Sequence, residues 1–269
     1  MIKADLFLWL FFFGTVALVL LSVETGYRLG QAAHRRSEEE KESPVAAMAG
    51  TILGLVAFLL AFTFGIASSR LDLRKELIRS EANAIETTFL RAEFLQGPDR
   101  EEVKRLLVRY LDERLAVTEA RTMEEVDAIV QRAREIHDRL WRIAVEHGLR
   151  ELNSDVAALY IDSLNEMFNL HHQRVAVGVQ TRIPLGVWVS LYVLSVLGML
   201  SMGYQSGVTG SKRSSASLIL AISFALVTSL IAALDRPLAS GFKLSQQPLI
   251  DVRGRMTTTP GDLLPGGNE

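Results

Sequence analysis

The chain has 269 residues, a formal net charge of −2 and no cysteine. The absence of cysteine excludes disulfide frameworks, thiolate metal sites and cysteine nucleophiles, and the small net charge gives no reason to expect nucleic acid as a partner. Apolar residues make up 49% of the chain and are concentrated in four blocks, whereas the middle of the chain is dense in arginine and glutamate. The distribution of the apolar residues therefore decides the class of protein.

Four apolar blocks predict four membrane-spanning helices. They cover about residues 6–23, 45–69, 183–204 and 216–234. Each block has roughly 18–24 residues, which is the length that a helix needs to cross a hydrocarbon layer of ~30 Å. Only a helix satisfies its own backbone hydrogen bonds inside lipid. We therefore predict an all-α, polytopic membrane protein, because a soluble domain of this size would not bury four such segments.

The first block could also be read as a cleaved signal peptide, because Lys3 precedes an apolar run. The block is long, and residues 21–25 (LSVET) contain no Ala-x-Ala-like cleavage site. We therefore expect this segment to remain as the first span of a hairpin over residues 1–69. The third and fourth spans form a second hairpin over residues 183–235, and residues 236–269 are expected to be a polar tail with a disordered end.

Residues 70–182 are predicted to form a helical, water-exposed domain between the second and third spans. Apolar side chains recur every three or four residues through most of this segment. The second span is expected to continue to about Leu95, where Gly97 and Pro98 follow. Predicted capping boxes then open two more helices. They are Asp99 with Glu102, and Thr122 with Glu125.

The last helix of this domain is expected to begin at Asn153 or Ser154, after the preceding helix has ended at Gly148. It is predicted to run toward Pro184 and to be continuous with the third span. The domain would then be a bundle of about four helices whose first and last members are membrane helices prolonged into water.

Two connections between predicted spans resemble each other. Residues 26–37 read GYRLGQAAHRRS, within a connection over residues 24–44, and residues 203–214 read GYQSGVTGSKRS, around a connection over residues 205–215. Tyrosine suits the membrane interface, and glycine permits the left-handed turn that ends a helix. Chance similarity of common loop residues is the alternative. A real repeat would mean two helical hairpins of the same polarity, separated by the inserted domain.

Enzyme chemistry is not indicated by any motif, and neither a cofactor nor a metal is expected. His171 and His172 are adjacent, so on a helix they point about 100° apart and make no natural two-ligand site. No Asp, Glu, Lys or Arg lies well inside a predicted span. Intramembrane charges usually mark proton relays or coupling sites. Their absence argues against a proton-coupled transporter and leaves a passive pore or a receptor-like scaffold.

The second span carries two stripes at helical spacing. The small residues, expected to serve helix packing, are Gly50, Gly54, Ala57, Ala61 and Gly65. The bulky residues, the candidate pore or gate, are Leu55, Leu59, Phe62 and Ile66. The span either packs closely on neighbouring helices or lines an oligomer axis, where a ring of bulky apolar side chains would gate by excluding water.

Polar residues follow two of the spans. The helix that prolongs the second span carries Glu81, Asn83, Glu86 and Arg91. They are either a partly anionic pore mouth that favours cations or a structural polar network. The fourth span is followed by a candidate interface anchor, with Glu81 or Arg91 as its expected partners. The anchor consists of Asp235, Arg236 and Pro237.

Several short segments, spread along the chain, form a recognisable set. They are 59–64 (LLAFTF), Ser69, Arg70, 81–85 (EANAI), 165–167 (NEM), Arg174, Arg182, Pro184, 235–237 (DRP), Gly241 and 245–249 (SQQPL). In these segments the chain resembles a bacterial family of membrane proteins of unknown function that is labelled bestrophin-like. Together these segments are spread over nearly the whole chain.

The resemblance implies kinship to bestrophins, which are pentameric anion or cation channels with four membrane helices and a pore lined by the second. In bestrophins that respond to calcium, an acidic cluster follows the fourth span. Residues 235–237 (DRP) stand there instead, and residues 67–70 (ASSR) replace the aromatic end of the pore helix. Calcium gating is therefore not expected. We expect an oligomeric, bestrophin-like ion channel, and the alternative is a non-conducting scaffold or sensor whose helical domain binds a partner.

The expected partners are the lipid bilayer, further copies of the chain and, for a channel, ions. Four spans place both termini and the inserted domain on one side of a bacterial inner membrane. The total of lysine and arginine favours a cytoplasmic position for that side, whereas the charge density of the two short connections favours the opposite orientation. We expect the domain to be cytoplasmic.

Overall fold

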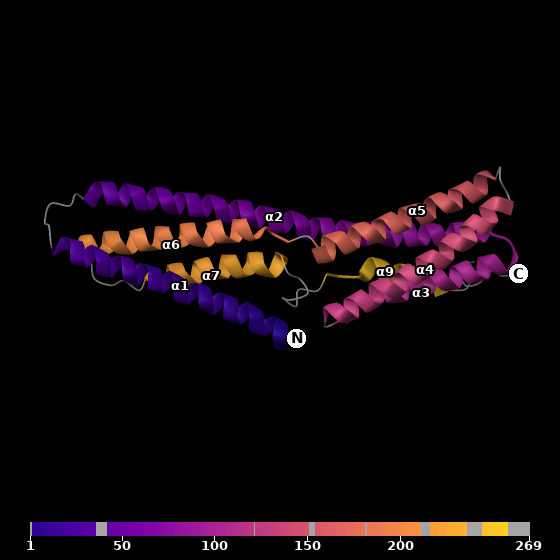
Figure 1. Ribbon diagram of the computed structural model, residues 1–269, viewed down its shortest axis with the longest axis horizontal. Helices are drawn as coiled ribbons and strands as arrows, with labels where there is room; N and C mark the ends of the chain where they lie inside the picture. Colours follow the sequence, from indigo (N-terminus) through magenta and orange to yellow (C-terminus); the bar gives the residue numbers. More distant parts are fainter. Residues whose placement is uncertain are drawn as a thin grey trace, which may run out of the picture. The chain divides into compact units, whose positions relative to one another are not determined.

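The computed structural model describes residues 2–35, 42–120, 122–150, 154–180, 182–210, 216–235 and 244–257, in which every regular element is a helix (Figure 1). The helices of the first half are α1 (Ile2–His34), α2 (Glu42–Arg91), η1 (Ala92–Phe94), α3 (Gly97–Ala116) and α4 (Met123–Arg150). Those of the second half are α5 (Asp155–Val175), η2 (Ala176–Gln180), α6 (Leu185–Val208), α7 (Ala216–Asp235) and α9 (Gln247–Thr257). The all-α prediction is confirmed.

The chain divides into two compact units. We call Met1–Leu71 with Arg182–Phe242 the membrane unit, and Asp72–Thr181 with Lys243–Glu269 the helical unit. The predicted spans are confirmed as four helices, α1, α2, α6 and α7, that are long and apolar enough to cross a membrane. The helix α2 has 50 residues, or about 75 Å, so only its apolar part fits within a bilayer. The predicted prolongation of the second span is also confirmed, because α2 ends at Arg91.

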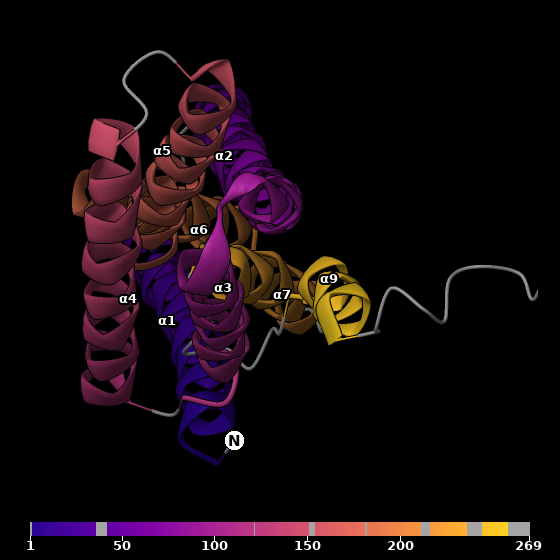
Figure 2. The same cartoon turned by 90° about the vertical axis from the view of Figure 1, so that its right-hand side faces the viewer.

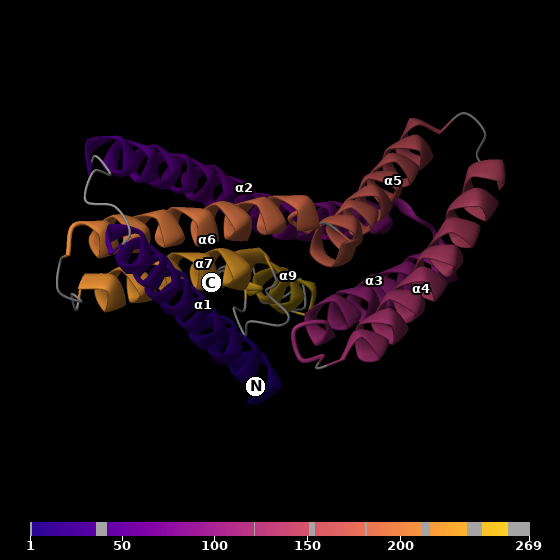
Figure 3. The same cartoon turned by 60° about the vertical axis from the view of Figure 1, so that its left-hand side comes forward.

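The four helices of the membrane unit share one apolar cluster. It contains Val19 of α1, Val56 of α2, Met199 of α6, and Ala221 and Phe224 of α7. The helix α1 packs most extensively on α6 and also contacts α7 (Figure 3). Each span therefore buries one stripe inside the unit and leaves the rest of its surface to lipid or to another chain.

The repeated glycines lie inside α1 and α6, not in turns. A Cβ atom added at Gly26 would overlap the carbonyl oxygen of Leu200, and one at Gly203 would overlap that of Val23. Glycine at these positions lets the two backbones touch, as in small-xxx-small helix pairs. Gly30 and Gly207 make the equivalent contacts one turn further on. Because the contacts advance along both helices together, α1 and α6 run parallel.

The predicted left-handed turn at the repeated glycines is therefore wrong. Among the described residues, only Gly97 and Gly210 have positive φ, at 58° and 64°. The first connection is also shorter than predicted, since α1 continues to His34. The similarity between the two repeated segments has a structural counterpart in how α1 and α6 pair. The hydroxyl groups of Thr15 and Tyr192, which are 177 residues apart in the sequence, form a hydrogen bond of 2.8 Å. Gly26 and Gly203 are separated by the same interval (203 − 26 = 177), so equivalent positions of the repeat face each other.

In the helical unit, α3 packs along α4, and α9 lies against α3 (Figure 2). The apolar core is built by side chains from α2, α3, α4, α5 and α9. Its fully buried members include Ile85, Leu107, Tyr110, Leu111, Leu140, Tyr160, Leu164, Met167 and Leu249. This core positions the polar network described below.

One predicted helix start in this unit is wrong. The helix α3 is capped by Gln96, which makes no side-chain capping bond, and it begins at Gly97 with Pro98 in its first turn. A left-handed glycine followed by proline sets the start, because proline lacks the N–H that a capping side chain would bind. Asp99 pairs instead with Arg150 at 3.2 Å.

Two other helix starts are confirmed. The Thr122 hydroxyl accepts a hydrogen bond from the Glu125 backbone N–H at 3.2 Å. Ser154 caps α5 by accepting from the Ala157 N–H, also at 3.2 Å. Asn153, the other candidate, lies outside the described residues.

The predicted continuity of α5 with the third span is wrong. The helix α5 passes at Ala176 into a short π-helix, residues 182–184 have no regular structure, and α6 begins at Leu185. Pro184 caps α6, and the residue before a proline is driven out of the helical conformation. Gly148 also does not end α4, which continues to Arg150.

The helix α9 lies within the segment that the sequence suggested was a polar tail. Leu249 and Val252 are buried in the core of the helical unit, and Met256 is nearly so. The segment 244–257 therefore contributes to the helical unit rather than extending from it as a free tail.

Candidate functional site

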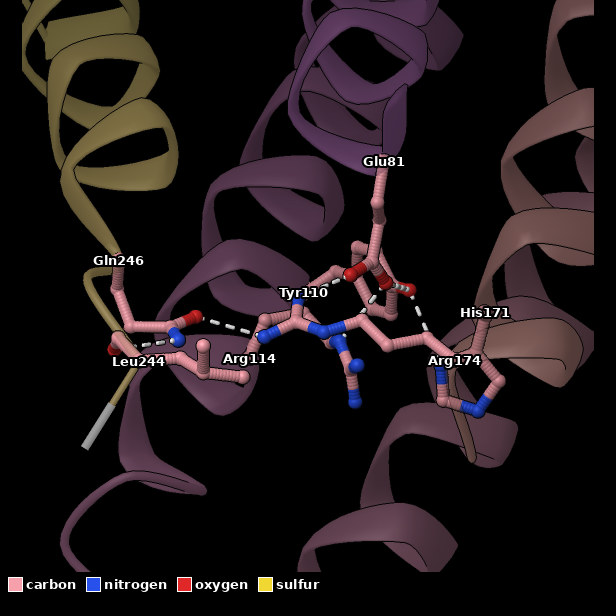
Figure 4. A network of polar contacts seen from close by, with 7 residues as sticks. All are labelled: Glu81, Tyr110, Arg114, His171, Arg174, Leu244 and Gln246. Carbon is pink, nitrogen blue, oxygen red and sulfur yellow. Dashed lines mark hydrogen bonds and ion pairs between the residues drawn. The ribbon is translucent and has the colours of Figure 1, made fainter. Parts of the chain in front are cut away.

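A buried ion network lies in the helical unit, centred on Glu81 of α2 (Figure 4). The carboxylate has no exposed surface. Its Oε1 atom lies 2.8 Å from Nε of Arg114 on α3, and its Oε2 atom accepts a hydrogen bond from Nη1 of Arg174 on α5. One carboxylate therefore joins three helices and faces two guanidinium groups.

Tyr110 and His171 complete this network. The Tyr110 hydroxyl donates to Oε1 of Glu81 at 2.6 Å, and it lies 3.1 Å from Nδ1 of His171. Because the hydroxyl proton points at the carboxylate, the imidazole must donate, so His171 is the Nδ1–H tautomer here. The orientation of the imidazole is thus determined by Glu81 through one intervening phenol.

The same network reaches the segment that precedes α9. Nη2 of Arg174 donates to Oε1 of Gln246 at 2.6 Å, and the Gln246 amide donates to the carbonyl of Leu244 at 3.1 Å (Figure 4). Glu81, Arg174 and Gln246 come from three of the separate segments that carry the family resemblance. Folding brings these three residues into one chain of polar contacts.

The electrostatics of the network keep Glu81 ionised. Burial alone would raise the pKa of this carboxyl, but Arg114 and Arg174 outweigh that effect and lower it to about 2. Burial and the neighbouring carboxylate raise the pKa of Tyr110, so the phenol stays protonated and continues to donate. Burial lowers the pKa of Arg174, against the pull of Glu81.

His137 of α4 adds an aromatic layer. Its ring lies 4.1 Å from that of Phe168, 4.7 Å from that of His171 and 4.8 Å from that of Tyr110, centroid to centroid. Burial, followed by the charge of neighbouring residues, lowers the pKa values of both His137 and His171 to about 3. Both imidazoles are therefore neutral at physiological pH. Within the described ranges no group of three or more His, Asp or Glu could hold a metal ion.

The four polar residues predicted on the prolonged second helix have different environments. Glu81 is buried, Asn83 is exposed, and Glu86 forms a two-bond pair with Arg255 of α9 at 2.6 and 2.8 Å. Arg91 donates to the carbonyl of Leu159 at 2.6 Å. Three of the four thus contact other parts of the helical unit, which favours the structural-network interpretation over an anionic pore mouth.

The predicted gate residues do not share one environment. Leu55 and Phe62 are 52% and 57% exposed. Leu59 is partly exposed, and Ile66 packs against the apolar cluster formed by Ala67, Ile183, Ile231 and Leu234. The outward face of α2 in the membrane unit therefore carries Leu55 and Phe62, while Ile66 belongs to the packing of the unit.

The predicted packing stripe of α2 also faces outward. Gly50, Gly54, Ala57, Ala61 and Gly65 are all exposed. A Cβ atom added at any of the three glycines would meet nothing within 4 Å. This contrasts with the glycines of α1 and α6, where added Cβ atoms would overlap backbone atoms. The small residues of α2 therefore do not pack against another described helix of the membrane unit.

Asp235, the first residue of the predicted anchor, is buried in the membrane unit. Its Oδ1 atom accepts from the Ile183 N–H at 2.8 Å and lies 3.4 Å from Nη1 of Arg70, and its backbone carbonyl accepts from Arg182 at 2.9 Å. The expected pairing of this anchor with Glu81 or Arg91 stays a prediction. Arg236 and Pro237 lie outside the described residues.

Sequence reasoning did not place Tyr110, Arg114 or His137 in a polar site, and it considered His171 only as a possible metal ligand. A signal for one of them was present, because Arg114 continues the apolar stripe of α3 one turn beyond Tyr110. A charged residue on an apolar stripe is a sign of a buried ion pair. The partners of such a residue come from other helices, so their identity does not follow from the spacing.

Comparison with known proteins assigns the chain to a family. The model of the Bestrophin-like domain matches residues 13–249. With four apolar helices in the described structure, the chain is a membrane protein and belongs to the Bestrophin-like family. Neither a curated protein nor a solved structure matches it.

Proposed function

We propose that the protein is an oligomeric membrane channel in which the outward face of α2 lines the path of the ions. The observation that carries this proposal is the surface of α2 in the membrane unit, where glycines and alanines alternate with bulky apolar side chains and face away from the other described helices of that unit. Membership of the Bestrophin-like family supports it, because bestrophins line their pore with the second helix.

Glycines in membrane helices usually mark close helix contacts, since lipid tails give them no packing advantage. In this chain α1 and α6 use their glycines in that way. The open glycines of α2 therefore favour a neighbour from a second copy of the chain. Several copies around an axis would place their α2 faces side by side.

Leu55 and Phe62 are the candidate gate on this face. They are seven residues, or two helical turns, apart, so they point in nearly the same direction. A ring of identical bulky apolar side chains narrows a pore and excludes water. Removal of the aromatic ring should therefore admit water and raise the leak of ions.

The test is ion flux from liposomes that contain Phe62→Ala. Since Phe62 is exposed in the single chain, we expect the variant to fold normally and to leak more than the parent protein. Phe13→Ala is the matched control, because Phe13 is 59% exposed on α1, away from the proposed pore face. A well-folded Phe62→Ala oligomer without added flux would contradict the gate.

The alternative function is a non-conducting scaffold or sensor whose helical unit binds a partner. Exposed apolar side chains on that unit, such as Leu90 and Leu149, favour it. The two functions differ in oligomeric state, because a monomer in detergent would have no axial pore. We further propose a cytoplasmic position for the helical unit, which a reporter fused after Glu269 would test.

A further inference from the structure

The two arginines around Asp235 form a cluster at the polar end of the membrane unit. Three spans end or begin there, since Arg70 follows the apolar part of α2, Arg182 precedes α6, and Asp235 is the last residue of α7. Arg70 contacts the Asp235 carboxylate at 3.4 Å, and Arg182 donates to its backbone carbonyl at 2.9 Å. The cluster therefore holds two guanidinium groups and one carboxylate.

The charges of this cluster do not balance. Two positive groups and one negative group leave an excess of one positive charge, and the carboxylate is 3% exposed while Arg70 is 20% exposed. Oδ1 of Asp235 is also occupied by the Ile183 N–H at 2.8 Å. A guanidinium has five N–H donors, and the contacts with Asp235 use one on each arginine. The accessible side of the cluster is therefore cationic and rich in donors.

The position of the cluster matches the head-group layer of a membrane. Ile183 follows Arg182 in the sequence, Leu234 precedes Asp235, and both are buried in an apolar cluster with Ala67 and Ile231. Trp188 packs against the same cluster, and tryptophan is enriched at the membrane interface. Arginine side chains near the ends of membrane helices extend toward the interface, where the lipid phosphates are.

The start of α6 adds to the attraction for an anion. Pro184 is its N-cap and supplies no capping side chain. A Cβ atom added at Gly186 would meet nothing within 4 Å, so the first turn is open to approach. The first N–H groups of a helix carry a partial positive charge. This feature supplements the two arginines, on which the inference rests.

We propose that Arg70 and Arg182 bind the phosphate of an anionic phospholipid, whose head group carries a net negative charge, at the edge of the bilayer. Guanidinium groups bind phosphate oxygens with paired hydrogen bonds, and basic pockets between membrane helices bind anionic head groups. Asp235 holds the two arginines in place without neutralising both. The proposal is independent of channel activity.

The experiment is native mass spectrometry of the full chain with phosphatidylglycerol or phosphatidylcholine. We expect the parent protein to retain phosphatidylglycerol preferentially and Arg182→Gln to retain at least about five-fold less, the loss of roughly one charge-assisted hydrogen bond. Arg28→Gln is the control, because Arg28 is 73% exposed on α1 and pairs with Glu24 of the same helix. Equal retention by Arg182→Gln and the parent, or equal retention of both lipids by the parent, would overturn the proposal.

Arg70→Gln replaces Arg182→Gln if the latter does not fold, with the same expectation. Inorganic phosphate distinguishes the two sources of the phosphate group. A rise in melting temperature with phosphatidylglycerol vesicles but not with phosphate, and absent in the variant, supports the lipid. An equal rise with phosphate alone would overturn the lipid as the source and assign the site to the free ion.

Discussion

Among single residues, Glu81 makes the most consequential contacts, because its carboxylate is buried against two arginines. Glu81→Gln would leave Arg114 and Arg174 buried with excess charge, and breaking a buried pair costs about 3–5 kcal/mol. We expect a large fall in the melting temperature of the detergent-purified protein. Glu86→Gln is the control, since its pair with Arg255 is more exposed and should contribute at most about 1 kcal/mol. Similar melting temperatures for the two variants would contradict this prediction.

The buried histidines predict acid sensitivity of the helical unit. The pKa values of His137 and His171 are lowered from 6.5 to about 3, so the unfolded chain binds more protons than the folded chain between these values. The contribution of the two neutral histidines to the stability of the helical unit is therefore fully present above about pH 6.5. It is lost as the pH falls below that value. Each histidine should lower the free energy of unfolding by about 1.4 kcal/mol per pH unit within that window.

The test of this prediction is the melting temperature between pH 7 and pH 5. The titratable and charged groups that act on His137 and His171 from neighbouring positions are Glu81, Arg114, Arg174 and His172. His137→Phe keeps the ring beside Phe168 and removes one titrating group, so it should reduce the pH dependence. An unchanged pH dependence in this variant would show that His137 is not responsible.

Among the elements, the pair α1 and α6 depends on glycine. Gly26→Ala would place a methyl group on the carbonyl oxygen of Leu200, with the Tyr204 nitrogen 2.9 Å away, so the helices must separate. We expect loss of folded protein or a much lower melting temperature. Gly14→Ala on the same helix is the control, because nothing lies within 4 Å of its added Cβ atom. Tolerance of both substitutions would contradict the close pairing.

At the scale of the whole molecule, the open glycines of α2 predict assembly. Gly54→Leu adds a side chain where the single chain offers no neighbour, so the fold of each subunit should persist while the contact between copies is disrupted. We expect native mass spectrometry to detect fewer assembled copies. Gly14→Leu, which is equally open but lies on α1, should leave the assembly unchanged. An oligomer of normal size in Gly54→Leu would argue against α2 as the contact surface.

The sequence alone was sufficient for the four spans and for the prolongation of α2. Both depend on local properties, namely the length of an apolar run and the periodicity of the helix, so no knowledge of neighbouring segments is needed. The Thr122 and Ser154 caps were predictable for the same reason. Gly26 and Gly203 were recognised as repeated, but their role was not, because a turn and a helix contact both select glycine.

Only the tertiary structure decided which polar residues come together. Glu81 could serve as a pore mouth or a buried ion, and the choice depends on Arg114 and Arg174, which lie 33 and 93 residues away (114 − 81 and 174 − 81) on other helices. Helical spacing orients a side chain on its own helix and carries no information about the neighbouring helix. The same reason applies to α9. Its few apolar residues are too weak a pattern to predict a buried helix, and only the structure identifies the core that buries them.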